Sequence, residues 1–168
     1  MARWSFSSSF ALACLLAGCA LAGPRPFPMG SSAESIVQGM GRPTAEHRMP
    51  PHVRRLEYSG GAYGRHTWMF DFDASDRLAA AEQVRTEAHF GAVRAGMTAE
   101  EVRARIGLPS TTWRIAWQNQ IVWSYRYETP FCKWFMVGMG PDGRVVDTAY
   151  GPDPLCDREN VRGGVGMP

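Results

Sequence analysis

Residues 98–109 read TAEEVRARIGLP, and this stretch decides the fold. Thr98 and Glu101 have the spacing of a capping box, in which each side chain hydrogen-bonds the backbone of the other residue at the start of a helix. Val102 and Ile106 lie one turn apart on a single helical face. Gly107, followed by proline at 109, is a signal for the end of a helix. The stretch therefore predicts a short amphipathic helix that ends just before residue 107.

A second short helix is predicted over 86–93, upstream of the first. Thr86 is its candidate cap, and Phe90 and Val93 are spaced to face a core. After residue 110 the apolar period changes to two, the period of strands with one buried face. The alternating residues are Trp113, Ile115 and Trp117, then Ile121, Trp123, Tyr125 and Tyr127, then Phe135, Val137 and Met139, then the run from Val145 to Tyr150. We therefore expect an α+β fold, with short helices packed on one face of an antiparallel sheet of three or four strands.

The first half of the chain repeats this order at a shift of 66 or 67 residues. Matching positions include Gly41 with Gly107, Tyr58 with Tyr125, and Trp68 with Phe135. Because the matches are collinear, we interpret them as an internal duplication, with a degenerate first module at 32–85 and a second module at 86–156. The first module lacks a convincing first helix. Each sheet alone is small, so the modules are expected to share a continuous sheet or a joint core.

The start of the chain is typical of a bacterial lipoprotein. Residues 1–18 have the basic start and short apolar stretch of a signal peptide, and that stretch is too short to span a bilayer. Leu16-Ala17-Gly18-Cys19 matches a lipobox, the motif at which bacterial lipoproteins are lipidated. This match favours a lipid on Cys19, with acyl chains such as palmitate, over an ordinary leader that happens to contain cysteine. Alanine at 20 favours the outer membrane, on its periplasmic side. Residues 19–31 are interpreted as a flexible lipidated tether and 157–168 as a flexible tail.

Charge and cysteine content restrict the class of protein further. Without Arg3, 17 basic residues face 16 acidic ones, a balance that indicates no nucleic-acid partner. Two cysteines remain beyond the leader and the lipid site. An oxidising compartment favours a disulfide between Cys132 and Cys156, and two thiols with no close Cys or His do not make a zinc site.

No candidate catalytic or metal site emerges from the sequence, and no cofactor or small-molecule substrate is expected. His47, His52, His66 and His89 have no ligand spacing, and we interpret them as surface or satisfied residues. Asp71, Asp73 and Asp76 lack the glycine and glutamate of a calcium loop, so a solvated hairpin turn explains them better. The sequence therefore does not predict an enzyme.

Aromatic residues are concentrated between 113 and 135. Most are expected in the core, but neighbours on a strand point to opposite faces, so some should be exposed. Exposed Trp or Tyr beside arginine would make a protein-binding patch, because such residues dominate interface hot spots. The candidate binding residues are Trp123, Tyr125, Arg126 and Trp134.

The second module resembles a known family over about 86–151. The resemblance is carried by Phe90-Gly91-Ala92-Val93-Arg94-Ala95-Gly96-Met97-Thr98, Trp123-Ser124-Tyr125 and Asp142-Gly143-Arg144-Val145, which are similar to motifs of the SmpA/OmlA (BamE-like) family. This resemblance implies a small outer-membrane lipoprotein with a two-helix, three-strand fold that binds partners and is not an enzyme. The tandem form also resembles β-lactamase inhibitory protein. None of the family's partner-binding or lipid-binding positions can be aligned here.

These patterns lead to one expected function and two rivals. We expect a lipid-anchored protein, facing the periplasm, that acts as a binding or scaffold component in outer-membrane assembly or maintenance. Its protein partners could include barrel-assembly components. The alternative is an inhibitor or modulator of a periplasmic enzyme that acts through a concave sheet. The remaining rival, an enzyme, requires a cluster of titratable residues in a pocket.

Overall fold

The computed structural model describes residues 27–49 and 52–156, which form an α+β fold with two antiparallel sheets. The first half contains α1 (Ala33–Met40), β1 (Ala45–Met49), β2 (His52–Ser59), the 3-10 helix η1 (Gly61–Tyr63), β3 (Thr67–Phe72) and β4 (Leu78–Gln83). The second half contains α2 (Glu87–Phe90), α3 (Ala99–Ile106), β5 (Thr111–Ile115), the 3-10 helix η2 (Ala116–Gln118), β6 (Gln120–Arg126), β7 (Lys133–Met139) and β8 (Val145–Pro152). The strand orders are β1-β2-β3-β4 and β5-β6-β7-β8, so each sheet is a simple meander.

The predicted helix at 99–106 is confirmed as α3. The Thr98 hydroxyl accepts from the Glu101 backbone N–H at 3.2 Å, and the Glu101 carboxylate accepts from the Thr98 backbone N–H at 2.7 Å. Val102 and Ile106 are completely buried. The helix predicted over 86–93 is shorter than expected, because α2 ends at Phe90. Val93 nevertheless reaches the core from the loop that follows.

The two halves repeat each other in topology and register. Gly41 and Gly107, 66 residues apart, end α1 and α3 with φ of 84° and 82°, a left-handed conformation that favours glycine. Tyr58 pairs with Trp68 across β2 and β3, and the matching pair across β6 and β7 is Tyr125 with Phe135. The sequence shift of 66 or 67 residues therefore corresponds to a structural repeat.

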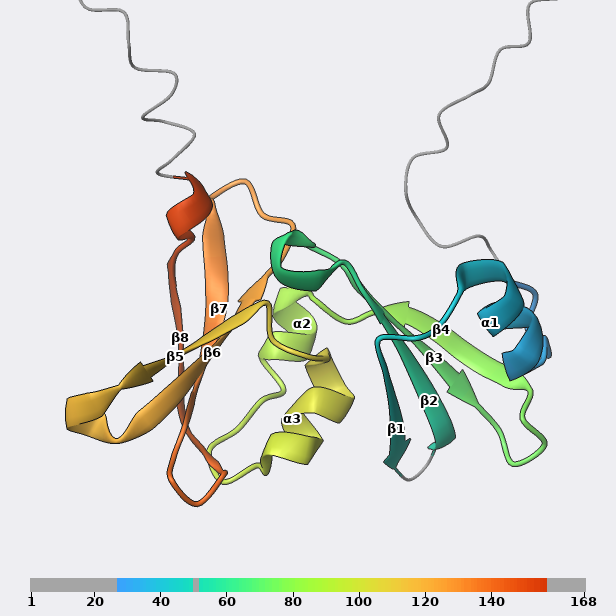
Figure 1. The fold of residues 1–168 in the computed structure, drawn as a ribbon, viewed down its shortest axis with the longest axis horizontal. Helices are drawn as coiled ribbons and strands as arrows, with labels where there is room; N and C mark the ends of the chain where they lie inside the picture. Colours follow the sequence, from blue (N-terminus) through green and yellow to red (C-terminus); the bar gives the residue numbers. More distant parts are fainter. Residues whose placement is uncertain (1–26, 50–51, 157–168) are drawn as a thin grey trace, which may run out of the picture.

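The elements form four layers in the order α1, first sheet, α2 with α3, second sheet (Figure 1). Ala33 and Ile36 of α1 pack on one face of the first sheet. The opposite face contacts α3, since the Arg55 guanidinium donates to the Ala104 carbonyl at 2.6 Å. The expected continuous sheet is wrong: there are two sheets with helices between them. The reason is that α3 of the second module packs on the face of the first sheet opposite α1, and this places the helices between the two sheets.

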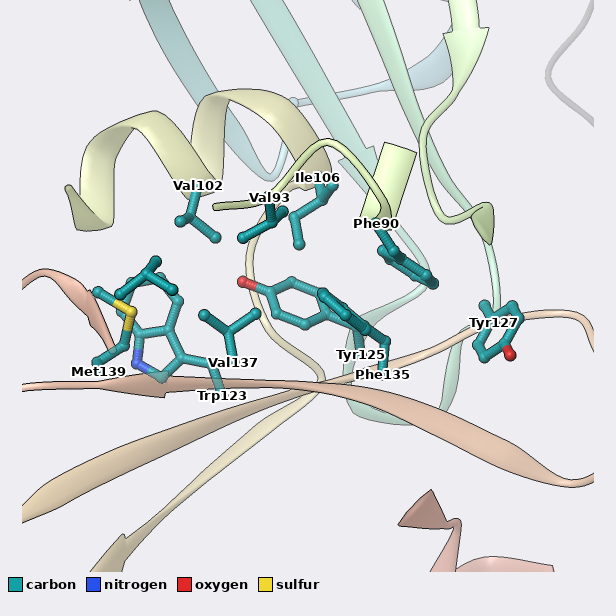
Figure 2. Close-up of a cluster of buried hydrophobic side chains, with 11 residues drawn as sticks. Phe90, Val93, Val102, Ile106, Trp123, Tyr125, Tyr127, Phe135, Val137 and Met139 are labelled. Carbon is teal, nitrogen blue, oxygen red and sulfur yellow. The ribbon is translucent and has the colours of Figure 1, made fainter. Parts of the chain in front are cut away.

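Each module has its own apolar core. Figure 2 shows the larger one, in which Phe90, Val93, Val102 and Ile106 from the helical side meet aromatic and aliphatic residues of the second sheet. Phe90 stacks on Phe135 with ring centroids 4.5 Å apart. The first module has a smaller cluster around Ile36, Leu56 and Phe70. No buried cluster spans the two modules within the described residues, so the expected joint core is also wrong.

The first module begins earlier than residue 32. The ring of Phe27 meets that of Phe70 edge-on with centroids 6.1 Å apart. The Gly30 backbone N–H donates to the Leu78 carbonyl, and the Leu78 N–H donates to the Ser31 carbonyl, at 2.9 and 2.8 Å. The predicted tether at 19–31 is therefore too long, because residues 27–31 pack on the module. The rest of the tether, the leader with Cys19 and the tail at 157–168 lie outside the described residues.

Candidate interaction site

The β5–β6 hairpin extends beyond the rest of the second sheet, at the left of Figure 1. Its strands pair from Thr111 with Ser124 to Ile115 with Gln120. The turn is closed by η2 and by Asn119, which has a left-handed φ of 50°. Asn tolerates this conformation better than other residues with a Cβ do. The Asn119 side-chain oxygen also accepts from the Arg114 guanidinium at 3.2 Å, which fixes the tip.

Large apolar side chains are exposed on this hairpin. Trp117, on η2, has 85% of its surface exposed, and Ile121, at the start of β6, has 49% exposed. Binding of a partner that covers exposed apolar groups of this size is favourable, because their apolar surface is removed from water. The tip is therefore suited to insertion into an apolar recess of another molecule.

A hollow of about 370 Å³ lies beside the hairpin. Its apolar surface comes from residues that include Ile121, Trp123 and Met139, and its polar lining includes Arg114 and Gln120. The turn at Gly140–Gly143 closes another side. Figure 2 places Trp123 and Met139 together at one end of the core cluster. The hollow combines an apolar floor with a cation, which suits an apolar side chain of a partner next to a carboxylate or carbonyl.

The four binding residues predicted from the sequence are buried, so the expected exposed patch is wrong. Trp134 is 7% exposed because the Trp113 ring stacks on it at 5.1 Å between centroids and the Arg126 guanidinium lies 5.3 Å from its ring. Tyr125 is completely buried in the core. Trp123 is 7% exposed, and the Arg103 guanidinium lies over its ring, 4.7 Å from the ring centroid.

Arg126 belongs to the contact between modules. Its guanidinium makes two hydrogen bonds to the Asp153 carboxylate, at 2.7 and 3.0 Å. A third bond, at 2.5 Å, goes to the Ala62 carbonyl on η1 of the first module. A paired and buried arginine of this kind orders the chain around it and is not available to a partner. The role of Arg126 is therefore structural.

Arg85 is the centre of the intermodule contact. It is 1% exposed, in the segment between β4 and α2. Its acceptors are the carbonyls of Gly64, Leu108 and Arg126 and the hydroxyls of Ser59 and Ser110, at 2.8 to 3.4 Å. Burial lowers the pKa of Arg85 to about 10, so the guanidinium remains cationic at neutral pH. One side chain thus links both modules.

Glu57 makes a second link between modules. Its carboxylate accepts from the Leu108 backbone N–H at 2.8 Å and is 2.9 Å from His47 Nε2. A Cβ at position 107 would be 2.9 Å from Glu57 Oε1, so only glycine permits this approach.

His89 is 2.8 Å from the Thr86 hydroxyl and 3.3 Å from Glu82. His47 and His89 therefore both have hydrogen-bond partners, as predicted.

The three aspartates do not share one environment. Asp73 and Asp76 lie in the exposed β3–β4 turn, as expected. Asp71 is 1% exposed and pairs with the Arg55 guanidinium at 2.5 and 2.7 Å, so a solvated turn is the wrong interpretation for this residue. Within residues 27–49 and 52–156, no group of three or more His, Cys, Asp or Glu side chains is arranged to hold a metal ion.

Cys132 and Cys156 are paired as a disulfide, as predicted, with Cα atoms 6.2 Å apart. The bond joins the β6–β7 loop to the short turn of helix after β8. The Asp153 N–H, which donates to the Cys132 carbonyl at 3.0 Å, lies beside it. The disulfide therefore fixes the segment that carries the Asp153 partner of Arg126.

Loss of the disulfide should destabilise the chain by about 3 kcal/mol, because the closed loop spans 24 positions and its restraint acts mainly on the unfolded state. Reduction, and the Cys132→Ala and Cys156→Ala variants, should lower the melting temperature equally. Calorimetry with and without reductant measures this loss. Two titratable thiols in the oxidised, purified protein would contradict the bond.

The sequence patterns do not predict the exposed tip of the hairpin. Trp117 continues a period-two pattern, which predicts a strand position. The polar run Gln118-Asn119-Gln120 was the available signal, because consecutive polar residues between two apolar runs indicate a turn. A turn there puts Trp117 at a tip, where neither helix layer covers it.

Comparison with known proteins identifies no family for this chain. No protein-family model matches it, and no curated protein does either. Among solved structures, it is similar to a DUF4309 family protein (YjgB) from Bacillus subtilis, with a TM-score of 0.30 and 12% identity over 73% of this chain and 79% of that one. It is also similar to an extracellular protein containing a SCP domain from Bacillus anthracis, with a TM-score of 0.29 and 10% identity over 79% of this chain and 46% of that one.

Proposed function

We propose that this chain is a lipid-anchored outer-membrane protein, facing the periplasm, that binds a protein partner in envelope assembly or maintenance through its β5–β6 hairpin. The observation that carries the binding role is the exposure of Trp117 and Ile121 beside the apolar-floored hollow. Tryptophan is among the residues that contribute most to protein interfaces. The envelope setting is supported by the lipobox at 16–19 and by the resemblance to the SmpA/OmlA family.

The partner can be identified by crosslinking in intact cells. A photoreactive benzoylphenylalanine in place of Trp117 should form a protein adduct, which mass spectrometry then identifies. The same group in place of Arg77, which is exposed in the β3–β4 turn of the first module, is the matched control and should form none. Trp117→Ala should weaken capture of the same partner by about tenfold or more without changing stability. Equal adducts from both positions would contradict the proposal.

The identity of the adduct also separates the two candidate roles. Barrel-assembly subunits would support the assembly role. A single periplasmic enzyme, inhibited by the purified protein, would support the alternative. The described strands form two separate sheets, so an inhibitor that acts through one sheet would use the sheet of a single module.

The anchor is tested separately, at Cys19. The Cys19→Ser variant should remain an uncleaved or mislocalised precursor, because a serine hydroxyl cannot form the thioether to the lipid. Membrane fractionation and globomycin-sensitive processing measure this, with Cys14→Ser as the matched control that should be processed normally. Normal outer-membrane fractionation of Cys19→Ser would rule out the anchor. No helix among the described residues is both long and apolar enough to cross a membrane.

A further inference from the structure

Two exposed aromatic residues lie on adjacent loops of the two modules. Tyr63, on η1, is 76% exposed, and Phe131, in the β6–β7 loop, is 71% exposed. The loops are joined because Arg126, at the end of β6, donates to the Ala62 carbonyl. The ion pair between Arg65 and Glu128, at 3.5 Å, joins them again. In Figure 1 both loops lie along the upper edge of the molecule.

Both loops are tied to the rest of the protein, by hydrogen bonds or by the disulfide. The η1 loop is fixed by Arg126 and by Arg85, which donates to the Gly64 carbonyl at 2.8 Å. The β6–β7 loop is fixed by the disulfide at Cys132, the residue after Phe131. Phe131 and Tyr63 are therefore presented to solvent by restrained segments, although exposure of such rings is unfavourable in water.

The described chain begins beside α1, which lies at the right of the molecule in Figure 1. Phe27, the first described residue, is packed on the first module. Cys19 precedes it by eight residues, which span at most about 28 Å when fully extended. A lipid on Cys19 would therefore hold Phe27 within about 28 Å of the bilayer surface.

The chemistry of the edge matches a bilayer interface. Phenyl and phenol rings insert at the boundary between headgroups and acyl chains. The Lys133 ammonium is 5.1 Å from the Phe131 ring centroid, on a long side chain that can reach the headgroups while the ring inserts. The Arg65–Glu128 pair leaves little net charge, so insertion of the rings and not attraction to anionic lipid would provide the contact.

We infer that the edge formed by η1 and the β6–β7 loop docks on the lipid bilayer through Tyr63 and Phe131. This inference rests on the proposed anchor at Cys19. The protein then lies with this edge on the membrane, and the β5–β6 hairpin, which extends from another side of the molecule, stays free for its protein partner (Figure 1).

The test uses the chain from Cys19 to Pro168 coupled to vesicles through its thiol. With the disulfide formed, Cys19 is the one remaining thiol, so it can be joined to a maleimide-bearing lipid whether or not cells lipidate it. Benzoylphenylalanine replaces Tyr63, Phe131 or Trp117 singly. Vesicles of phosphatidylcholine alone are compared with vesicles that also contain phosphatidylglycerol.

On irradiation, positions 63 and 131 should form lipid adducts on both kinds of vesicle. Position 117, which is more exposed than either but lies on the hairpin, should form none above background. Adducts at 117 and none at 63 and 131 would overturn the inference, as would no lipid adduct at all. Adducts only on phosphatidylglycerol vesicles would also overturn it, because they would indicate headgroup attraction. In intact cells, a protein adduct at 131 in place of a lipid adduct would show that this edge faces a protein. Because the anchor is supplied chemically, failure here is distinct from failure of the Cys19→Ser test.

Discussion

Replacing Arg85 with alanine should lower the free energy of unfolding by about 3 kcal/mol or more, because each buried acceptor left without a donor costs about 1–3 kcal/mol. The substitution removes the Arg85 donor from three backbone carbonyls and two hydroxyls, in a site with 1% exposure. The two hydroxyls, of Ser59 and Ser110, each still accept from one backbone N–H. Urea denaturation followed by circular dichroism measures the loss. Because Arg85 contacts both modules, we also expect a single transition to separate into two.

Two variants define the cause of that loss. Arg85→Met restores most of the volume without the donors and should remain destabilised, because the carbonyl acceptors cannot be replaced by apolar packing. Arg48→Ala removes an arginine whose side chain is 82% exposed and should change the stability by less than about 0.5 kcal/mol. If Arg85→Ala lost no more than Arg48→Ala, the intermodule network would not contribute to stability.

The sequence was most informative where local rules decide the structure. The capping box at Thr98, the glycine after α3 and the period-two runs of the second sheet each depend on residues close in the chain. The repeat added long-range information, because the position of Gly107 predicted the role of Gly41. The disulfide was predictable because only two cysteines remain once the leader and the lipid site are set aside.

The contact between modules could not be predicted in this way. Arg55 and Asp71 alternate along their strands with buried apolar residues, and that pattern normally indicates a face turned to solvent. Here the polar face is covered by α3, and its charges pair with each other and with backbone groups of the second module. Alternation identifies which residues share a face, but it does not say what covers that face.

The same limit explains the error over the aromatic residues. Trp134 was expected to be exposed because it points away from the helical face, and it does so. It is nonetheless buried, since Trp113 from β5 stacks on it and Arg126 lies beside it. Neighbouring side chains on an open sheet face can cover one another, which depends on strand register and twist. The exposed apolar residues are instead on turns, at Trp117, Tyr63 and Phe131.

Separating the modules should destabilise both, and the first more than the second. A fragment of residues 86–168 keeps the larger core cluster and the disulfide, but it loses Arg85 and the sheet that covers Ala104 and Leu108. We expect it to fold with a melting temperature clearly below that of the full chain. A fragment of residues 20–85 keeps only the small core cluster and would expose Glu57, Met69 and Asp71, all at most 1% exposed in the full chain. It should show no cooperative transition.

Calorimetry and denaturant titration of the two fragments, alone and mixed, test this expectation. Mixing should restore part of the lost stability, because Glu57 and Arg55 of one fragment can again bind the backbone of α3 and Leu108 in the other. In the Arg55→Ala version of the first fragment, which lacks the donor to the Ala104 carbonyl, the recovery should be smaller. A monomeric 86–168 fragment that melts at the temperature of the full chain would show that the second module does not depend on the first. The contacts between the buried charges of the first sheet and α3 would then stabilise only the first module.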